Sequence, residues 1–141
     1  MILVIFSLSF GKNHSLTLGI DENINLLSLR NDYSLAENSH LYISVGFGLG
    51  FSGFFTGFKY DPNPRNFGNS YTVGLGFSDG GRDRNDEREI NKVFQASIFR
   101  KLIVNESNKS FLNVGFTYWK VINSKSQPIN FLPVISYSIN F

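Results

Sequence analysis

The segment from Phe131 to Phe141 constrains the fold more than any other part of the chain. Its odd-numbered positions are apolar throughout, whereas its even-numbered positions become polar toward the end, at Ser136, Ser138 and Asn140. Because successive side chains of a β-strand point to opposite faces, this alternation predicts a strand with one apolar face. The apolar positions are Phe131, Pro133, Ile135, Tyr137, Ile139 and Phe141.

The same period of two recurs in residues 40–51, 70–78, 92–102 and 110–122. In each of these segments one face carries large apolar side chains, and the other carries mainly Gly, Ser, Thr and Asn. Small polar residues suit the interior of a narrow barrel, and large apolar residues suit a surface that faces lipid. We therefore expect Leu41, Val45 and Phe47 to point outward, and Gly46 and Gly48 to line the interior.

Composition agrees with a β-protein and excludes several classes of function. The 15 Phe and 13 Gly residues disfavour helices. The chain has no Cys, so it has no disulfide and no thiolate metal site. A net charge of +2 is too small to indicate binding to nucleic acid.

Polar and glycine-rich turns divide the chain into strands. The pattern predicts seven of them, at residues 24–35, 40–51, 53–60, 70–78, 92–102, 110–122 and 131–141, and an eighth at either 15–20 or 2–10. An even number of strands, most of them roughly 9–13 residues long and so able to cross a bilayer, favours a closed antiparallel up-and-down transmembrane β-barrel. The predicted fold is therefore all-β, with about eight strands in one domain over residues 11–141.

Residues 1–10 form the first apolar run, MILVIFSLSF. The run fits the apolar region of a secretory signal peptide that is later removed, although a positive segment before it and a typical cleavage site after it are missing. It also alternates well enough to be a first strand. Both interpretations remain open from the sequence.

The C-terminal pattern resembles the insertion signal of small bacterial outer-membrane β-barrels, the class that includes OmpX and the transmembrane domain of OmpA. Tyr137, Ile139 and Phe141 match that signal. The resemblance implies a bacterial outer-membrane location, insertion by the barrel-assembly machinery, contact with membrane lipid and lipopolysaccharide, a mostly filled lumen, a monomer, and no cofactor. It implies a structural, adhesion or surface-binding role rather than an enzyme.

Two alternative functions stay open. A lipid-modifying enzyme on the same barrel would need a His and a Ser brought together, and neither His14-Ser15 nor Ser39-His40 can form such a pair alone, because adjacent strand residues point to opposite faces. A soluble lipid-binding barrel would need its large apolar residues to point inward.

The run from residue 82 to 92 mixes basic and acidic side chains. Arg82, Arg84, Arg88 and Lys92 are its basic residues. We expect a charged loop that either is only solvated or contacts lipopolysaccharide phosphates through these residues.

Overall fold

The computed structural model describes residues 13–21, 23–48, 52–63, 68–82, 88–105, 109–122 and 131–141, with side chains for all of these except 80–82, 88, 89 and 105. The described residues form eight strands and no helix. The strands are β1 (Asn13–Ile20), β2 (Leu27–Ala36), β3 (Ser39–Phe47), β4 (Ser52–Tyr60), β5 (Asn69–Arg82), β6 (Arg88–Asn105), β7 (Ser110–Val121) and β8 (Phe131–Asn140).

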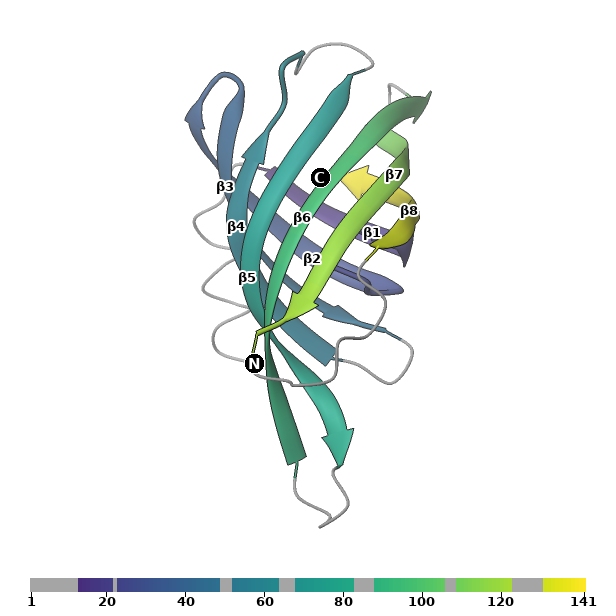
Figure 1. Cartoon of the computed structure of the whole chain (residues 1–141). Helices are drawn as coiled ribbons and strands as arrows, with labels where there is room; N and C mark the ends of the chain where they lie inside the picture. The colour runs from purple at the N-terminus through teal and green to yellow at the C-terminus, as the bar shows by residue number, and fades with distance from the viewer. Residues whose placement is uncertain are drawn as a thin grey trace.

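Every strand pairs antiparallel with the next, and β1 pairs with β8, so the sheet closes into an up-and-down barrel (Figure 1). This confirms the predicted eight-stranded closed barrel. The strand between residues 53 and 60 is confirmed as β4, and the missing eighth strand is β1 rather than 2–10, which lies outside the described residues.

Several strand ends were wrong. β2 begins at Leu27 and not at residue 24, because Ile24 lies in a tight turn with a φ of 64° and donates its N–H to the Asp21 carbonyl. β3 ends at Phe47. The predicted range 40–51 was therefore too long, since alternation alone does not show where a pairing partner ends.

β5 and β6 were longer than predicted. Pairing of β4 with β5 reaches Ser78, and pairing of β7 with β6 reaches Val93, whereas β5 and β6 go on pairing with each other up to Arg82 and Arg88. The two strands therefore extend beyond the barrel wall, at the bottom of Figure 1. We call this end of the barrel the hairpin end, and the opposite end, where β1 begins and β8 finishes, the terminal end.

The predicted outward positions are confirmed. Most of the large apolar side chains of the alternating segments are exposed, and Val45 is partly exposed. The exposed set includes Leu41, Phe47, Val73, Leu75, Val114, Phe116, Ile135 and Ile139. The residues predicted to line the interior lie on the opposite face, where Gly46, Gly74, Asn113, Ser136 and Ser138 are buried and Gly48 and Gly115 are half-buried.

The inner glycines make room for aromatic rings that cross the lumen. A methyl group on Gly74 would overlap the Tyr42 hydroxyl, and one on Gly57 would overlap the Val73 carbonyl of β5 and meet the edge of the same ring. Phe55 lies over Gly53 and Gly76 in the same way. The glycine-rich segments are therefore a packing requirement of the interior.

The interior also holds side chains much larger than the Gly, Ser, Thr and Asn that are frequent on the inner face. Tyr42, Phe55, Val93, Trp119 and Val121 form a buried apolar cluster. Long charged side chains are buried as well, as described below. Both fit because glycines on neighbouring strands leave the space that the larger side chains fill.

We expect Gly74→Ala to destabilise the barrel by about 1–3 kcal/mol, the usual cost of overpacking. The new methyl group must displace the Tyr42 ring. Tyr42→Leu shortens the side chain over Gly74, so Gly74→Ala should cost much less stability in that background than in the wild type. Urea unfolding of detergent-refolded single and double variants measures this coupling, and equal costs in both backgrounds would contradict the packing described here.

Candidate functional site

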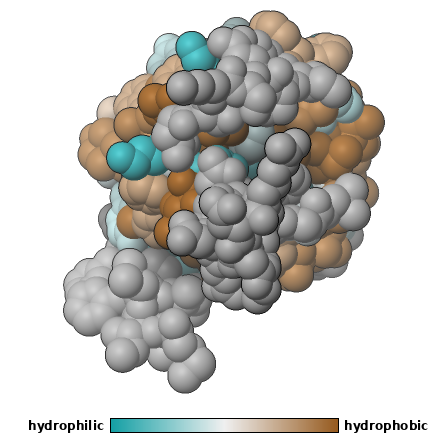
Figure 2. Space-filling model, turned by 60° about the horizontal axis from the view of Figure 1, so that its bottom comes forward, coloured by the Kyte–Doolittle hydropathy of each residue, from teal (hydrophilic) through white to brown (hydrophobic). Residues whose placement is uncertain are grey.

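The outer wall of the barrel is an almost continuous apolar surface. Figure 2, seen from the hairpin end, shows apolar side chains around much of the visible wall. Large exposed apolar side chains occur on every strand, and an exposed apolar surface of this extent marks contact with lipid or with another protein. The outer wall is therefore the first candidate functional surface.

Aromatic side chains gather at the two rims of this wall. Tyr60 and Tyr71 pair near the terminal end, with their ring centroids 6.5 Å apart. Toward the hairpin end, Tyr118 contacts Phe94 and Phe131, at 6.4 and 5.3 Å between centroids. Two aromatic girdles with an aliphatic band between them are typical of membrane barrels. The outward-facing Tyr71, Tyr118 and Tyr137 thus fit interfacial positions, whereas Trp119 points inward.

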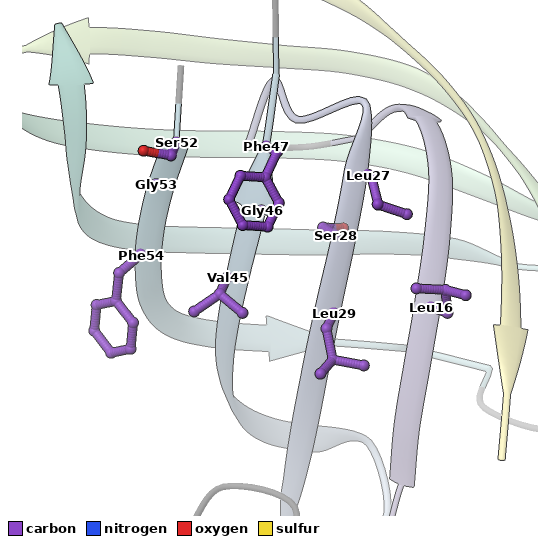
Figure 3. Close-up of a pocket in the computed structure, with 10 residues that line it drawn as sticks. All are labelled: Leu16, Leu27, Ser28, Leu29, Val45, Gly46, Phe47, Ser52, Gly53 and Phe54. Carbon is purple, nitrogen blue, oxygen red and sulfur yellow. The ribbon is translucent and has the colours of Figure 1, made fainter. Parts of the chain in front are cut away.

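A shallow groove of about 550 Å³ hollows the outer wall across β1 to β4 (Figure 3). Its walls are the outward side chains of Leu16, Leu29, Val45 and Phe54, which lie side by side in one row of the sheet. Ser52 is a small residue next to Phe47 in the adjoining row. The groove therefore exposes almost only hydrocarbon.

The lumen holds a charged cluster near the terminal end, made of Arg30, Asp32, Lys59, Asp61 and Lys101. Asp32 accepts from Arg30 Nε at 2.5 Å and from Lys59 Nζ at 2.8 Å. Asp61 Oδ2 lies 3.2 Å from the ammonium groups of both Lys59 and Lys101. Four of the five residues are buried, and the Lys101 side chain retains 26 % exposure. Charges buried to this extent persist in proteins only when they are paired.

Tyr42 links the charged cluster to the rest of the lumen. The Arg30 guanidinium lies 4.0 Å from the centroid of the Tyr42 ring, and the Tyr42 hydroxyl donates to Gln95 Oε1 at 3.1 Å. Gln95 in turn donates to Thr72 at 2.9 Å. The apolar cluster around Trp119 follows toward the hairpin end. The described side chains thus form an ionic layer and an apolar layer within the lumen.

The turn between β1 and β2 adds a polar layer. The Asp21 carboxylate accepts the backbone N–H groups of Asn23 and Asn25, and Asn23 donates its side-chain amide to Ser44 Oγ at 3.0 Å. All four residues are buried, and Asn25 lies over Gly46. The turn therefore folds into the barrel instead of projecting from it.

Asp61 follows the last residue of β4 and has a perturbed acidity. Burial raises the pKa of Asp61, but the ammonium groups of Lys59 and Lys101 and the hydroxyl of Ser70 together lower it more, so that the pKa falls from 3.8 to about 2. Asp61 therefore stays ionised throughout the physiological range, and the ion pairs hold the end of β4 against β6.

The residues of the predicted insertion signal share the outer face of β8. Tyr137 is half-buried, Ile139 is exposed, and Phe141 is 64 % exposed. Phe141 and His14 exchange backbone hydrogen bonds, and their rings lie 5.8 Å apart. Phe141 therefore contributes little packing to the folded barrel.

The predicted basic contacts fall into three groups. Arg84 lies outside the described residues. Arg82 and Arg88 pair through their backbones at the tip of β5 and β6, so they belong to strands and not to a loop. Lys92 is exposed on the outer face of β6, next to Phe77 of β5.

Ser34 and His40 form a hydrogen bond of 3.2 Å between Oγ and Nδ1, across β2 and β3. The sequence did not predict this pair. No carboxylate of the described residues hydrogen-bonds the His40 ring, so the third group of a hydrolytic triad is missing there. The described residues also contain no cluster of three metal-binding side chains and no helix long and apolar enough to span a membrane.

The charged cluster was missed from the sequence, although its signal was present. Arg30 and Asp32 share the even parity of Ser28, and Lys59 shares the odd parity of Phe55 and Gly57. Parity predicts that these charged side chains point into the barrel. It does not predict their ion-pair partners, because the pairs join β2, β4 and β6 across the lumen.

Comparison with models of known families, with curated proteins and with solved structures gives no match for this chain. The functional conclusion therefore rests on the geometry alone.

We expect Asp61→Asn to remove part of the acid sensitivity of folding. The folded-state pKa of Asp61 lies below its unfolded value, so its contribution is complete above about pH 4 and is lost as the pH falls toward 2. The wild type should lose on the order of 2 kcal/mol over that range through this group. Urea unfolding in detergent at pH 6 and near pH 2 measures the difference.

Ser70→Ala removes only the hydroxyl contact to Asp61. It should also reduce the stability that is lost between pH 6 and pH 2, but by less than Asp61→Asn does. Identical pH dependence in the wild type and in Asp61→Asn would contradict this account of the cluster.

Proposed function

We propose that this chain is an integral outer-membrane β-barrel protein with a structural, adhesion or surface-binding role and a lumen closed by its own side chains. The observation that carries the proposal is the partition of side chains between the two faces. Large apolar residues cover the outside, while Arg30, Asp32 and Lys59 are buried inside. Such a partition is unfavourable in water and favourable in a bilayer.

The height of the apolar wall supports a membrane setting. Lys92 and Arg100 both lie exposed on the outer side of β6. They are ~8 residues apart, which is about 26 Å along a strand and about 20 Å along the axis of a barrel whose strands tilt by ~40°. The side chains between them on that face are Phe94, Ala96 and Ile98. An apolar band in a membrane barrel is ~25 Å tall.

A soluble lipid-binding barrel is the less favoured alternative. Such a barrel keeps an apolar cavity inside and polar side chains outside. Here the lumen holds ion pairs and the Tyr42–Gln95–Thr72 hydrogen bonds, and the apolar groove lies on the outer wall. The ion pairs and hydrogen bonds in the lumen therefore disfavour an interior site for a lipid tail.

The side chains inside the lumen also favour a structural, adhesion or surface-binding role over a diffusion pore. The ionic layer and the apolar cluster place large side chains in the lumen. An eight-stranded barrel is only wide enough for side chains to fill its interior, which disfavours free diffusion of solutes. We infer that the terminal end faces the periplasm and the hairpin end faces outward, so that β5 and β6 extend from the cell surface. That extension is the part best placed to adhere to another molecule.

We expect Leu75→Arg to cost about 2–4 kcal/mol in phospholipid bilayers. Leu75 lies midway between Tyr71 and Asp79 on the outer face of β5, and is 55 % exposed. Val104→Arg is the matched control, because Val104 is equally exposed at 58 % but lies beyond Arg100 near the terminal end. The control should cost only ~0–1 kcal/mol.

Urea titration of both variants refolded into phospholipid vesicles gives the two free energies. Equal costs would contradict a depth-dependent lipid surface. A wild type that fails to enter vesicles, or that shows no heat-modifiable gel mobility, would overturn the proposed function.

We also expect Phe141→Ser to lower the amount of folded protein in bacterial outer membranes while leaving the stability of detergent-refolded protein nearly unchanged. Phe141 makes few contacts in the folded barrel, so its main contribution is to recognition during assembly. Quantitative blotting of membrane fractions and urea unfolding measure the two effects. Equal membrane levels for wild type and variant would reject the insertion signal.

A further inference from the structure

Two lysines lie side by side on the outer wall at its hairpin rim. Lys120 of β7 is paired with Phe94 of β6, and the N–H of Ile122 donates to the Lys92 carbonyl at 2.7 Å. This register makes Lys92 and Lys120 diagonal neighbours on one face, a spacing that long side chains bridge easily. Both side chains are exposed.

An aromatic platform lies directly below the two lysines, toward the middle of the wall. Tyr118 packs edge-on against Phe94, with 6.4 Å between ring centroids, and contacts Phe131 of β8 at 5.3 Å. The three rings cover adjacent positions of β6, β7 and β8. Cations above and rings below give this part of the wall an amphipathic surface that runs along the barrel axis.

The rest of this rim differs. Phe47, Phe54 and Phe77 continue the aromatic girdle over β3, β4 and β5, and among the described residues the only cation paired with any of them is Lys92 itself, opposite Phe77. Asp79 of β5 is diagonal to Lys92, on the side away from Lys120. Positive charge at the described rim is therefore concentrated over β6 and β7.

We propose that Lys92 and Lys120 bind the phosphate of an anionic membrane lipid, whose acyl chain lies along Phe94, Tyr118 and Phe131. The inference rests on the proposed function, because it requires the outer wall to face lipid. Charge complementarity selects a phosphate group, and continuity with the apolar wall selects a lipid rather than a soluble anion. Aromatic rings at the level just below a headgroup suit the interfacial region of a bilayer.

The test compares lipid retention by the whole chain refolded into phosphatidylcholine vesicles that contain a minor fraction of phosphatidylglycerol. Heat-modifiable gel mobility first establishes that each variant has inserted. Native mass spectrometry after transfer to detergent then measures the phosphatidylglycerol that remains bound. Lys92→Gln combined with Lys120→Gln should weaken retention by about tenfold, since each cation near an anionic surface contributes measurably.

The matched control removes the same number of charges from the terminal rim. Arg100→Gln combined with Lys109→Gln should leave retention nearly unchanged, although both residues are exposed cations. Lys92→Arg combined with Lys120→Arg should retain the lipid, and Asp79→Asn should strengthen retention by removing the neighbouring carboxylate.

Three outcomes overturn the inference. One is unchanged retention in the double glutamine variant, and another is an equal loss in the control variant. The third is displacement of the lipid by inorganic phosphate at constant ionic strength, which indicates a site for a free anion. Each of these can occur while the barrel inserts normally, so they are distinct from a wild type that fails to insert, which would overturn the proposed function itself.

Discussion

The ladder between β1 and β8 determines the rest of the structure, because an eight-stranded sheet has no free edge only when its first and last strands pair. That ladder runs from Ser15 opposite Asn140 to Ile20 opposite Ile135. It passes Gly19, whose φ of 103° and close approach to the Ile135 carbonyl admit no larger residue. Once the ring is closed, every strand has a fixed inner and outer face, and the sorting of side chains follows.

The inner and outer faces of the barrel then differ in which side chains they can hold. Inside, buried charges are tolerable only because each one is paired, as Lys59 is with Asp32 of β2 and with Asp61, two residues farther along the chain. Outside, pairing around the closed ring satisfies the backbone of the wall, so the wall can be apolar between its rims. The ionic layer therefore fixes the interior, and the apolar wall is suited to contact with lipid or with another protein. These two facts together support the membrane role proposed above.

Alternation in the sequence predicted most of the strands, the closed antiparallel barrel and the outward set of residues, because parity is a local property of a strand. The same reasoning could not predict what fills the lumen. Arg30 and Tyr42 meet on neighbouring strands, and Tyr42 reaches Gln95 of β6. Such contacts depend on the diameter and stagger of the barrel, which no single segment contains. The sequence also did not predict that β5 and β6 extend beyond the barrel wall. A segment of mixed charge is interpreted as a loop until its pairing partner is known.

The Tyr42 ring and the two glycines beneath it, Gly57 and Gly74, have an implication for how such a sequence changes over evolutionary time. The Tyr42 side chain compels Gly74, whereas Gly57 is compelled first by the β5 backbone at Val73 and Gly74. Related sequences should therefore change residues 42 and 74 together, with a small residue 42 wherever 74 carries a side chain, and should keep Gly57 whatever residue 42 is. Covariation of this kind would couple β3 to β5.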